Sequence, residues 1–217
     1  MLENIILGGP MMIPLLICSV VTVGACIDRA IAFYKNSQVD HRALHAEVLT
    51  LLAEGRLDDA ITLCASTPGP VAAVLLVGLQ SYRKLIDRKE SAQGLRTLVG
   101  KSMDDYSMHA MSSVQKRFGI LATVGNAAPL FGMAGTVLGM INSFAVMVDH
   151  GMDANKVAGG ISEALITTAA GLLIALAAVI PLNYFTSLTE EIELDIEDSA
   201  SDLVEYIALN AEQQQDG

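Results

Sequence analysis

Among the polar side chains in the long apolar stretches of the sequence, one carboxylate and three of the threonine hydroxyls could pass protons to one another. Glu163 is the single charged residue of its stretch, and Thr167 and Thr168 follow it by about one helical turn. Thr136 stands in a different apolar stretch that contains no charged residue. A hydroxyl both donates and accepts hydrogen bonds, so it can meet a carboxyl group in either protonation state. These residue types predict proton transfer.

Each of these residues also has a plainer interpretation. Glu163 can cap its helix, because the amino terminus of a helix favours a carboxylate, or it can simply lie at the membrane interface. A threonine hydroxyl often bonds to the preceding turn of its own helix. A proton relay needs a group at the membrane centre that takes up and releases a proton. At that depth the sequence offers only hydroxyls. Either the chain moves no protons, or a partner brings the second titrating group.

Three apolar stretches, residues 5–27, 118–148 and 161–185, must position these side chains. Each reaches the length of about 20 residues that a helix needs to cross a hydrocarbon core of about 30 Å. Only 17% of the residues are charged, against about a quarter in soluble domains. The sequence therefore predicts an all-α, polytopic membrane protein with three transmembrane helices, the first of which is retained rather than cleaved as a signal peptide.

The basic residues set the expected orientation. Residues 28–117 hold 12 of the 13 lysines and arginines, several of them beside the apolar stretches. Because such residues stay on the cytoplasmic side, residues 28–117 are predicted to form a cytoplasmic section. The amino terminus and a short loop, residues 149–160, then lie in the periplasm. The acidic tail, residues 186–217, returns to the cytoplasm.

The cytoplasmic section reads as helical. Leu44, Val48 and Leu52 have helical spacing, Gly55 interrupts the pattern, and a second short helix follows from residue 57 to residue 64. The sequence "TPGP", residues 67–70, predicts a turn.

Three later segments complete the prediction for the cytoplasmic side. Residues 71–83 are apolar, and we expect them near the membrane surface or against a neighbouring chain. Residues 90–117 are expected to run as one long helix straight into the second span. The tail is either an acidic helix that attracts cations or a solvated amphipathic helix that extends the third span, and the two are compatible.

Small residues recur in the second and third spans. Gly125, Gly132 and Gly139 are spaced by seven residues, Gly135 lies beside them, and Gly171 stands in the third span. Transmembrane helices associate where small residues let their backbones approach. We expect these glycines to be helix-packing positions.

The motifs around these residues resemble those of a known family. "NAAPLFGMAGTVLGMINSF" and "ISEALITTAAGLLIALAAVIPLNYF" are similar to the second-span and third-span signatures of the MotA/TolQ/ExbB proton-channel family. The resemblance extends over nearly the whole chain and is strongest to ExbB-type biopolymer transport proteins.

The resemblance implies a homo-pentameric ring in the bacterial inner membrane around two single-span helices of the ExbD/TolR type, each bearing an aspartate. The motor would energise outer-membrane transport through TonB, or envelope maintenance through TolA if the chain is of the TolQ type. By position, Thr136 and Thr168 correspond to the channel threonines and Glu163 to the outer access carboxylate. On the helical wheel Thr167 lies nearer Glu163 than Thr168 does, so both threonines are kept.

Other function classes fit less well. An intramembrane enzyme needs a nucleophile with a base or paired carboxylates at membrane depth, but the four histidines lie outside the apolar stretches. No basic stripe interleaved with aromatics indicates nucleic-acid binding. We expect no enzyme activity, cofactor or metal, with membrane lipids among the partners. A non-conducting membrane scaffold is the alternative from another class.

Overall fold

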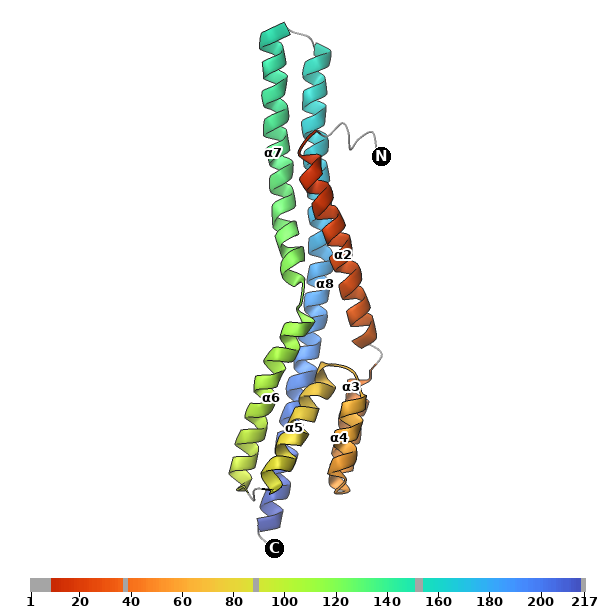
Figure 1. Cartoon of the computed structure of the whole chain (residues 1–217), viewed down its shortest axis with the longest axis vertical. Coiled ribbons are helices and arrows are strands. Elements are labelled where there is room, and N and C mark those ends of the chain that lie inside the picture. The colour runs from red at the N-terminus through yellow and green to blue at the C-terminus, as the bar shows by residue number, and fades with distance from the viewer. Residues whose placement is uncertain (1–8, 37–38, 88–89, 151–153, 216–217) are drawn as a thin grey trace. The chain divides into compact units, whose positions relative to one another are not determined.

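The chain is helical throughout the part that the computed structural model describes, residues 9–36, 39–87, 90–150 and 154–215, where no strand occurs. This confirms the all-α prediction. The helices are α2 (Met12–Asn36), α3 (His41–Ala53), α4 (Leu57–Ser66), α5 (Pro70–Asp87), α6 (Ala92–Val114), α7 (Phe118–His150) and α8 (Ala154–Gln215) (Figure 1).

Three segments carry helices long and apolar enough to cross a membrane: Met12–Ala53, Phe118–Val148 and Val157–Ala211. This number agrees with the sequence prediction. α7 and α8 extend beyond the predicted spans, and both enter the predicted loop of residues 149–160. Residues 5–8 of the first predicted span and residues 151–153 of the loop lie outside the described residues.

The chain divides into two compact units. The first, here called the span unit, comprises the residues up to Ala30 together with Arg117–Phe185. The second, here called the bundle unit, comprises Ile31–Lys116 and the chain from Thr186 onward. α8 contributes its first half to the span unit and its second half to the bundle unit.

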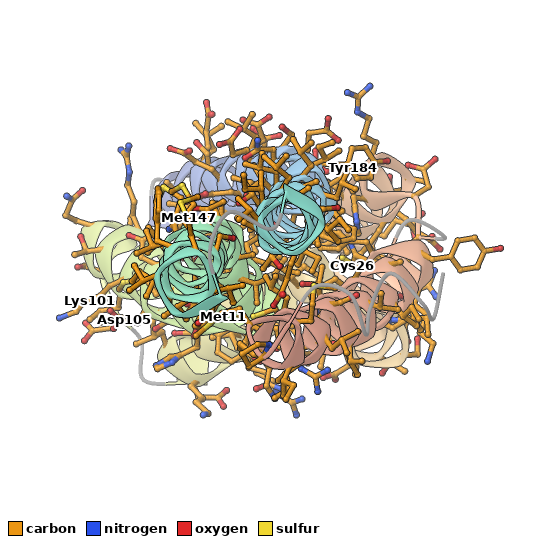
Figure 2. All side chains as sticks on the ribbon, turned by 90° about the horizontal axis from the view of Figure 1, so that it is seen from above. Met11, Cys26, Lys101, Asp105, Met147 and Tyr184 are labelled. Carbon is orange, nitrogen blue, oxygen red and sulfur yellow. The ribbon has the colours of Figure 1, made fainter. Side chains whose placement is uncertain are left out.

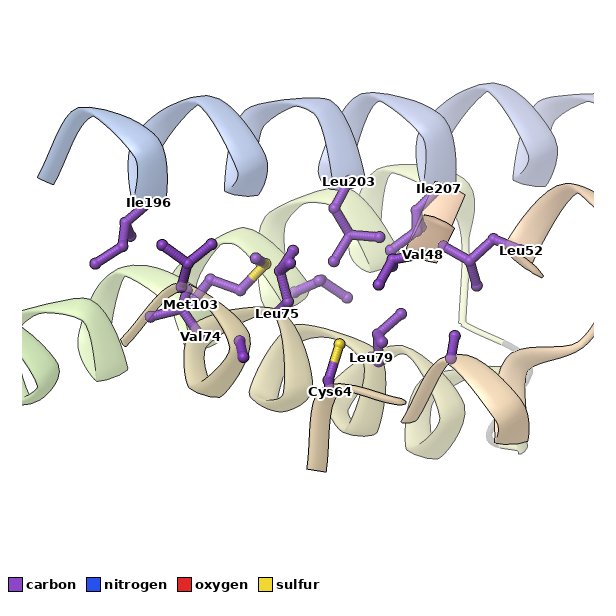
Figure 3. Close-up of a cluster of buried hydrophobic side chains, with 14 of the residues drawn as sticks. Val48, Leu52, Cys64, Val74, Leu75, Leu79, Met103, Ile196, Leu203 and Ile207 are labelled. Carbon is purple, nitrogen blue, oxygen red and sulfur yellow. The ribbon is translucent and has the colours of Figure 1, made fainter. Parts of the chain in front are cut away.

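The core of the bundle unit is built around α5. Val71, Val74, Leu75 and Leu79 are almost fully buried and lie in one cluster with residues of α3, α4, α6 and α8 (Figure 3). Burying such side chains stabilises the unit by about 1.5–3 kcal/mol each. The apolar face of α5 is therefore buried within its own chain, where a neighbouring chain was one expectation, and the expected position of residues 71–83 near the membrane surface stays a prediction.

The second half of α8 is amphipathic. Ile192, Ile196, Leu203 and Ile207 are buried in the same cluster, at the spacing that one helical face requires. The acidic residues between them are mostly exposed. This arrangement favours the amphipathic interpretation of the tail. Its attraction for cations stays a prediction.

α6 does not continue into α7, so the prediction of one long helix over residues 90–117 is wrong. The helix ends at Val114, and Arg117 takes a left-handed backbone conformation with φ 71°. A non-glycine residue rarely does so, because the left-handed region costs roughly 1–2 kcal/mol. The Arg117 guanidinium pairs with Asp28 of α2, with 3.0 Å between Nη1 and Oδ1. This long-range pair stabilises the break.

Shorter signals position the remaining helices, and two of them, Gly55 and the turn at residues 67–70, were predicted from the sequence. The Asp40 side chain accepts hydrogen bonds from the backbone N–H groups of Arg42 and Ala43 and so caps α3. Gly55, with φ 75°, turns the chain between α3 and α4. Gly69 of the "TPGP" turn, with φ 131°, precedes α5.

Candidate functional site

α7 and α8 approach each other with almost no side-chain volume between them. A Cβ atom on Gly132 would lie 3.1 Å from the Cα atom of Thr168, and one on Gly139 would lie 2.8 Å from the Cβ atom of Ala164. A Cβ atom on Gly171 would lie 2.6 Å from the carbonyl oxygen of Ala128. The two backbones are therefore in direct contact through the middle of the span unit, as the paired ribbons in Figure 1 show.

All five glycines singled out from the sequence lie on this contact between α7 and α8. Gly125 faces Val179, 2.6 Å from the position of its missing Cβ, and Gly135 faces Thr167. The packing partners are residues of the same chain. A contact of these glycines with a neighbouring subunit stays a prediction.

Thr168 joins the two helices by a hydrogen bond. Its hydroxyl donates to the carbonyl oxygen of Gly132 on α7 at 2.9 Å. That carbonyl is reachable because Gly132 has no side chain. Thr168 remains partly exposed, so its oxygen can still accept a hydrogen bond from outside.

Thr167 is enclosed instead. It is only 1% exposed, its side chain lies against Gly135, and its hydroxyl donates to the carbonyl oxygen of Glu163 at 2.9 Å. The helical wheel placed Thr167 near Glu163, and the backbone hydrogen bond reflects that spacing. Burial between α7 and α8 leaves Thr168 as the threonine of the pair with access to a partner.

Thr136 is partly exposed on α7, and its hydroxyl donates to the carbonyl oxygen of Met133 at 2.7 Å. Among the described residues, no hydrogen bond joins Thr136 to Glu163 or Thr168. Within the part of the chain that the structure describes, the predicted proton-pathway residues are therefore not linked into a continuous series of hydrogen bonds.

Glu163 does not cap α8. The helix begins at Ala154, nine residues earlier, and the field of a helix terminus falls off within about one turn. The capping interpretation therefore fails. The carboxylate lies instead against Gly9, three residues before α2, because a Cβ atom on Gly9 would overlap its Oε1 atom.

At the end of the span unit where α7 begins lie a group of charged side chains and a pair of aromatic rings. Asp28 pairs with Arg29 at 2.7 Å and with Arg117 at 3.0 Å. The rings of Phe118 and Phe185 stack with their centroids 6.5 Å apart. Two of the basic residues that predicted the orientation therefore lie at the same end of the span unit.

Sequence reasoning missed two polar contacts in the span unit. Ser143 donates a hydrogen bond to the carbonyl oxygen of Gly139 at 2.9 Å, and a Cβ atom on Gly160 would overlap its hydroxyl. Gly9 was missed as the neighbour of Glu163. The glycine pair ahead of α2 and the pair ahead of the third predicted span were the available signals, but a sequence does not show which residue each one approaches.

A groove of about 1090 Å³ lies in the bundle unit between α6 and α8. Its lining combines methionines and small residues with four carboxylates and one arginine: Asp104, Glu193, Glu197, Glu205 and Arg96. Lys101 and Asp105 of α6 are exposed and point away from the helix (Figure 2). Within the described residues, no group of three or more histidines, cysteines or acids could hold a metal ion.

Residues 67–198 match the model of the MotA/TolQ/ExbB proton channel family. The biopolymer transport protein ExbB of Neisseria meningitidis serogroup A is 29% identical over 209 residues, which cover 90% of this chain and 91% of that protein. ExbB of Salmonella typhimurium is 31% identical over 176 residues, which cover 80% of this chain and 70% of that protein.

A putative biopolymer transport protein, ExbB-like 3 of Synechocystis, is 30% identical over 191 residues, covering 83% of this chain and 82% of that protein. Family model and relatives together include both apolar helices of the α7–α8 contact. The chain belongs to the MotA/TolQ/ExbB proton channel family.

Proposed function

We propose that this chain is the ExbB-type subunit of a motor in the bacterial inner membrane that is driven by the proton motive force. With an ExbD-type single-span partner, it would energise TonB-dependent transport across the outer membrane. The observation that carries the proposal is the Thr168–Gly132 hydrogen bond at the glycine-lined contact between α7 and α8. It holds Thr168 against α7 in the apolar part of α8, in a chain of a proton-channel family.

The residues of the chain suit a wall that conducts protons only with a partner. Thr136 and Thr168 are partly exposed and carry hydroxyls, whereas Glu163 is the one acid in the apolar part of α8. Five copies around two partner helices would place these hydroxyls near the partner's aspartate. Glu163 would take up protons on the periplasmic side and Thr167 would hold the backbone behind it. Each charge that crosses 100 mV releases about 2.3 kcal/mol.

The charged cluster at the end of the span unit supports the proposed orientation. Asp28, Arg29 and Arg117 lie together, and basic residues beside spans stay in the cytoplasm. The bundle unit would then be cytoplasmic with the carboxyl terminus. The amino terminus and the α7–α8 connection would be periplasmic.

The test is native mass spectrometry of the complex purified with its membrane partners. Five copies of this 22.9 kDa chain with two copies of a small single-span protein that has a membrane aspartate are the expected result. A partner of the TolR type would favour the TolQ role. A monomer or dimer without such a protein would overturn the proposal and favour the scaffold.

Proton flux into proteoliposomes holding the complex tests the residues themselves. We expect Thr136→Val and Glu163→Gln each to reduce flux strongly while the assembly stays intact. Normal flux in both variants would remove these side chains from the proposed pathway.

A further inference from the structure

The start of α2 lies directly against the Glu163 carboxylate. A Cβ atom on Gly9 would overlap Oε1 of Glu163 and would lie 2.9 Å from its Cδ atom and 3.4 Å from its Cγ atom. Gly9 also has φ 69°, a backbone conformation that side chains other than glycine rarely adopt. The backbone conformation therefore favours glycine at this position, and the carboxylate end of the Glu163 side chain occupies the space that a Cβ atom would need.

Gly9 is held in place by the helix that follows it. Its carbonyl oxygen accepts a hydrogen bond from the N–H of Met12 at 3.1 Å, which starts α2. Met12 and Leu15 are buried in a cluster with residues of α7 and α8. Met11, labelled in Figure 2, lies beside Gly135, with its Cβ atom 3.6 Å from the position of the missing Cβ.

The position of the carboxylate follows from these contacts. Glu163 lies one turn before Thr167, which is buried against Gly135 and fixes the backbone of α8 there. The side chain of Glu163 extends from this fixed backbone to the fixed first turn of α2. Any side chain added at residue 9 must displace the carboxylate, because the backbone on both sides is packed.

We infer that Gly9 is a positioning residue for Glu163: the turn that leads into α2 holds the carboxylate where it takes up protons. The inference rests on the proposed function for the role of Glu163, and on the structure alone for the contact. It assigns α2 a part in proton access although its residues contribute no hydroxyl or carboxylate to the pathway.

The contact is tested without any measurement of flux. In the assembled complex, with Cys18, Cys26 and Cys64 replaced by alanine, the pair Gly9→Cys and Glu163→Cys should form a disulfide under mild oxidation. The control pair is Gly24→Cys with Glu163→Cys, because Gly24 lies further along α2 and has no neighbouring atom within 4 Å of a built Cβ. Absence of the first link, or equal formation of both, would overturn the inference.

The positioning role is tested by proton flux. We expect Gly9→Ala to reduce flux at least about tenfold, since a 1 Å misplacement can cost about 10²-fold. Gly24→Ala, with open space and an ordinary backbone conformation, should leave flux unchanged. Gly55→Ala in the bundle unit is a second control, because Gly55 has φ 75° and open space around a built Cβ atom. Its assembly and flux show the effect of the strained backbone conformation in the absence of a clash.

Shortening the acid separates positioning from mere folding. The double variant Gly9→Ala with Glu163→Asp should recover flux relative to Gly9→Ala, because the shorter side chain frees the space that the Cβ atom needs. A loss of flux without this recovery would show that Gly9 serves only the local backbone. Normal flux in Glu163→Gln together with a formed 9–163 disulfide would overturn the proposed role of Glu163 but leave the contact standing.

Discussion

The hydroxyl of Thr168 donates a hydrogen bond to the carbonyl oxygen of Gly132, and so α8 is joined to α7 at 2.9 Å in the middle of the apolar contact. Interhelical hydrogen bonds of this kind add about 0.6 kcal/mol on average in membrane proteins. A bond this weak contributes little to stability. Its position beside the partly exposed face of both helices gives it a functional interest instead.

Thr168→Val should therefore separate stability from conduction. We expect a loss of only about 0.6 kcal/mol in unfolding free energy, but a strong loss of proton flux. Thr167→Val is the matched control, because its hydroxyl is buried and bonded to its own helix, and it should keep most of the flux. If Thr167→Val abolishes flux and Thr168→Val does not, the assignment of the two threonines must be reversed.

The glycine contact predicts a position-specific effect of adding one methyl group. Gly171→Ala places a Cβ atom 2.6 Å from the carbonyl oxygen of Ala128, and overpacking of this kind costs about 1–3 kcal/mol. The expected result is a lower thermal midpoint and poorer assembly of the purified complex.

Gly119→Ala is the control for Gly171→Ala. Gly119 lies on α7, and a Cβ atom there would meet nothing within 4 Å. It should be neutral or slightly stabilising, because alanine favours a helix over glycine by about 1 kcal/mol. Equal destabilisation at Gly119 and Gly171 would contradict the packing described above.

The break between α6 and α7 gives a comparison between two substitutions at one residue. Arg117→Ala and Arg117→Gly both remove the ion pair with Asp28, but only glycine accepts φ 71° without strain. The glycine variant should be more stable than the alanine variant by about 1 kcal/mol. Chemical denaturation of both would measure this difference. Alanine at least as stable as glycine would mean that the left-handed conformation is not retained.

The bundle unit should lose stability in alkali. Burial raises the pKa of Cys64 to about 11 from 9.0, and burial, then the nearby Tyr206, raises the pKa of Tyr82. Because both raised values favour the neutral, protonated form in the folded state, the stabilisation is complete below the unfolded pKa and is lost as the pH rises through the folded pKa.

Thermal unfolding measured across this alkaline range should therefore show a falling midpoint, and the fall should be shallower in Cys64→Ala. The thiol should also react slowly with alkylating reagents, since Cys64 is buried. Rapid alkylation in the intact protein, or an identical pH dependence in the variant, would contradict the burial of this residue.

The sequence was sufficient for the type, number and approximate extent of the helices, since apolar length and periodicity are local properties. It was not sufficient for features that depend on a distant partner. Residues 71–83 are apolar in either setting, and periodicity does not say whether lipid, a neighbour or the chain's own α8 covers them. The break at Arg117 has no proline or glycine at that residue to mark it, and the partner of its guanidinium, Asp28, lies far earlier in the chain.

The candidate site divides in the same way. The seven-residue spacing of glycines predicted close helix contact, but the pairing of Gly132 with Thr168 is a matter of register between helices that only the structure supplies. Glu163 stood out as an acid in an apolar stretch. Its neighbour Gly9 lies more than a hundred residues earlier and has no side chain to draw attention.

The direct backbone contact of α7 and α8 has a mechanical consequence. Long side chains that interdigitate can change rotamers and let two helices slide past each other. The close contacts at Gly132, Gly139 and Gly171 leave no room for such rearrangements. The two helices should therefore move as one rigid unit. If the proposed ring forms around a partner, each α7–α8 pair would tilt as a unit, and the flexibility would have to come from the contacts between subunits.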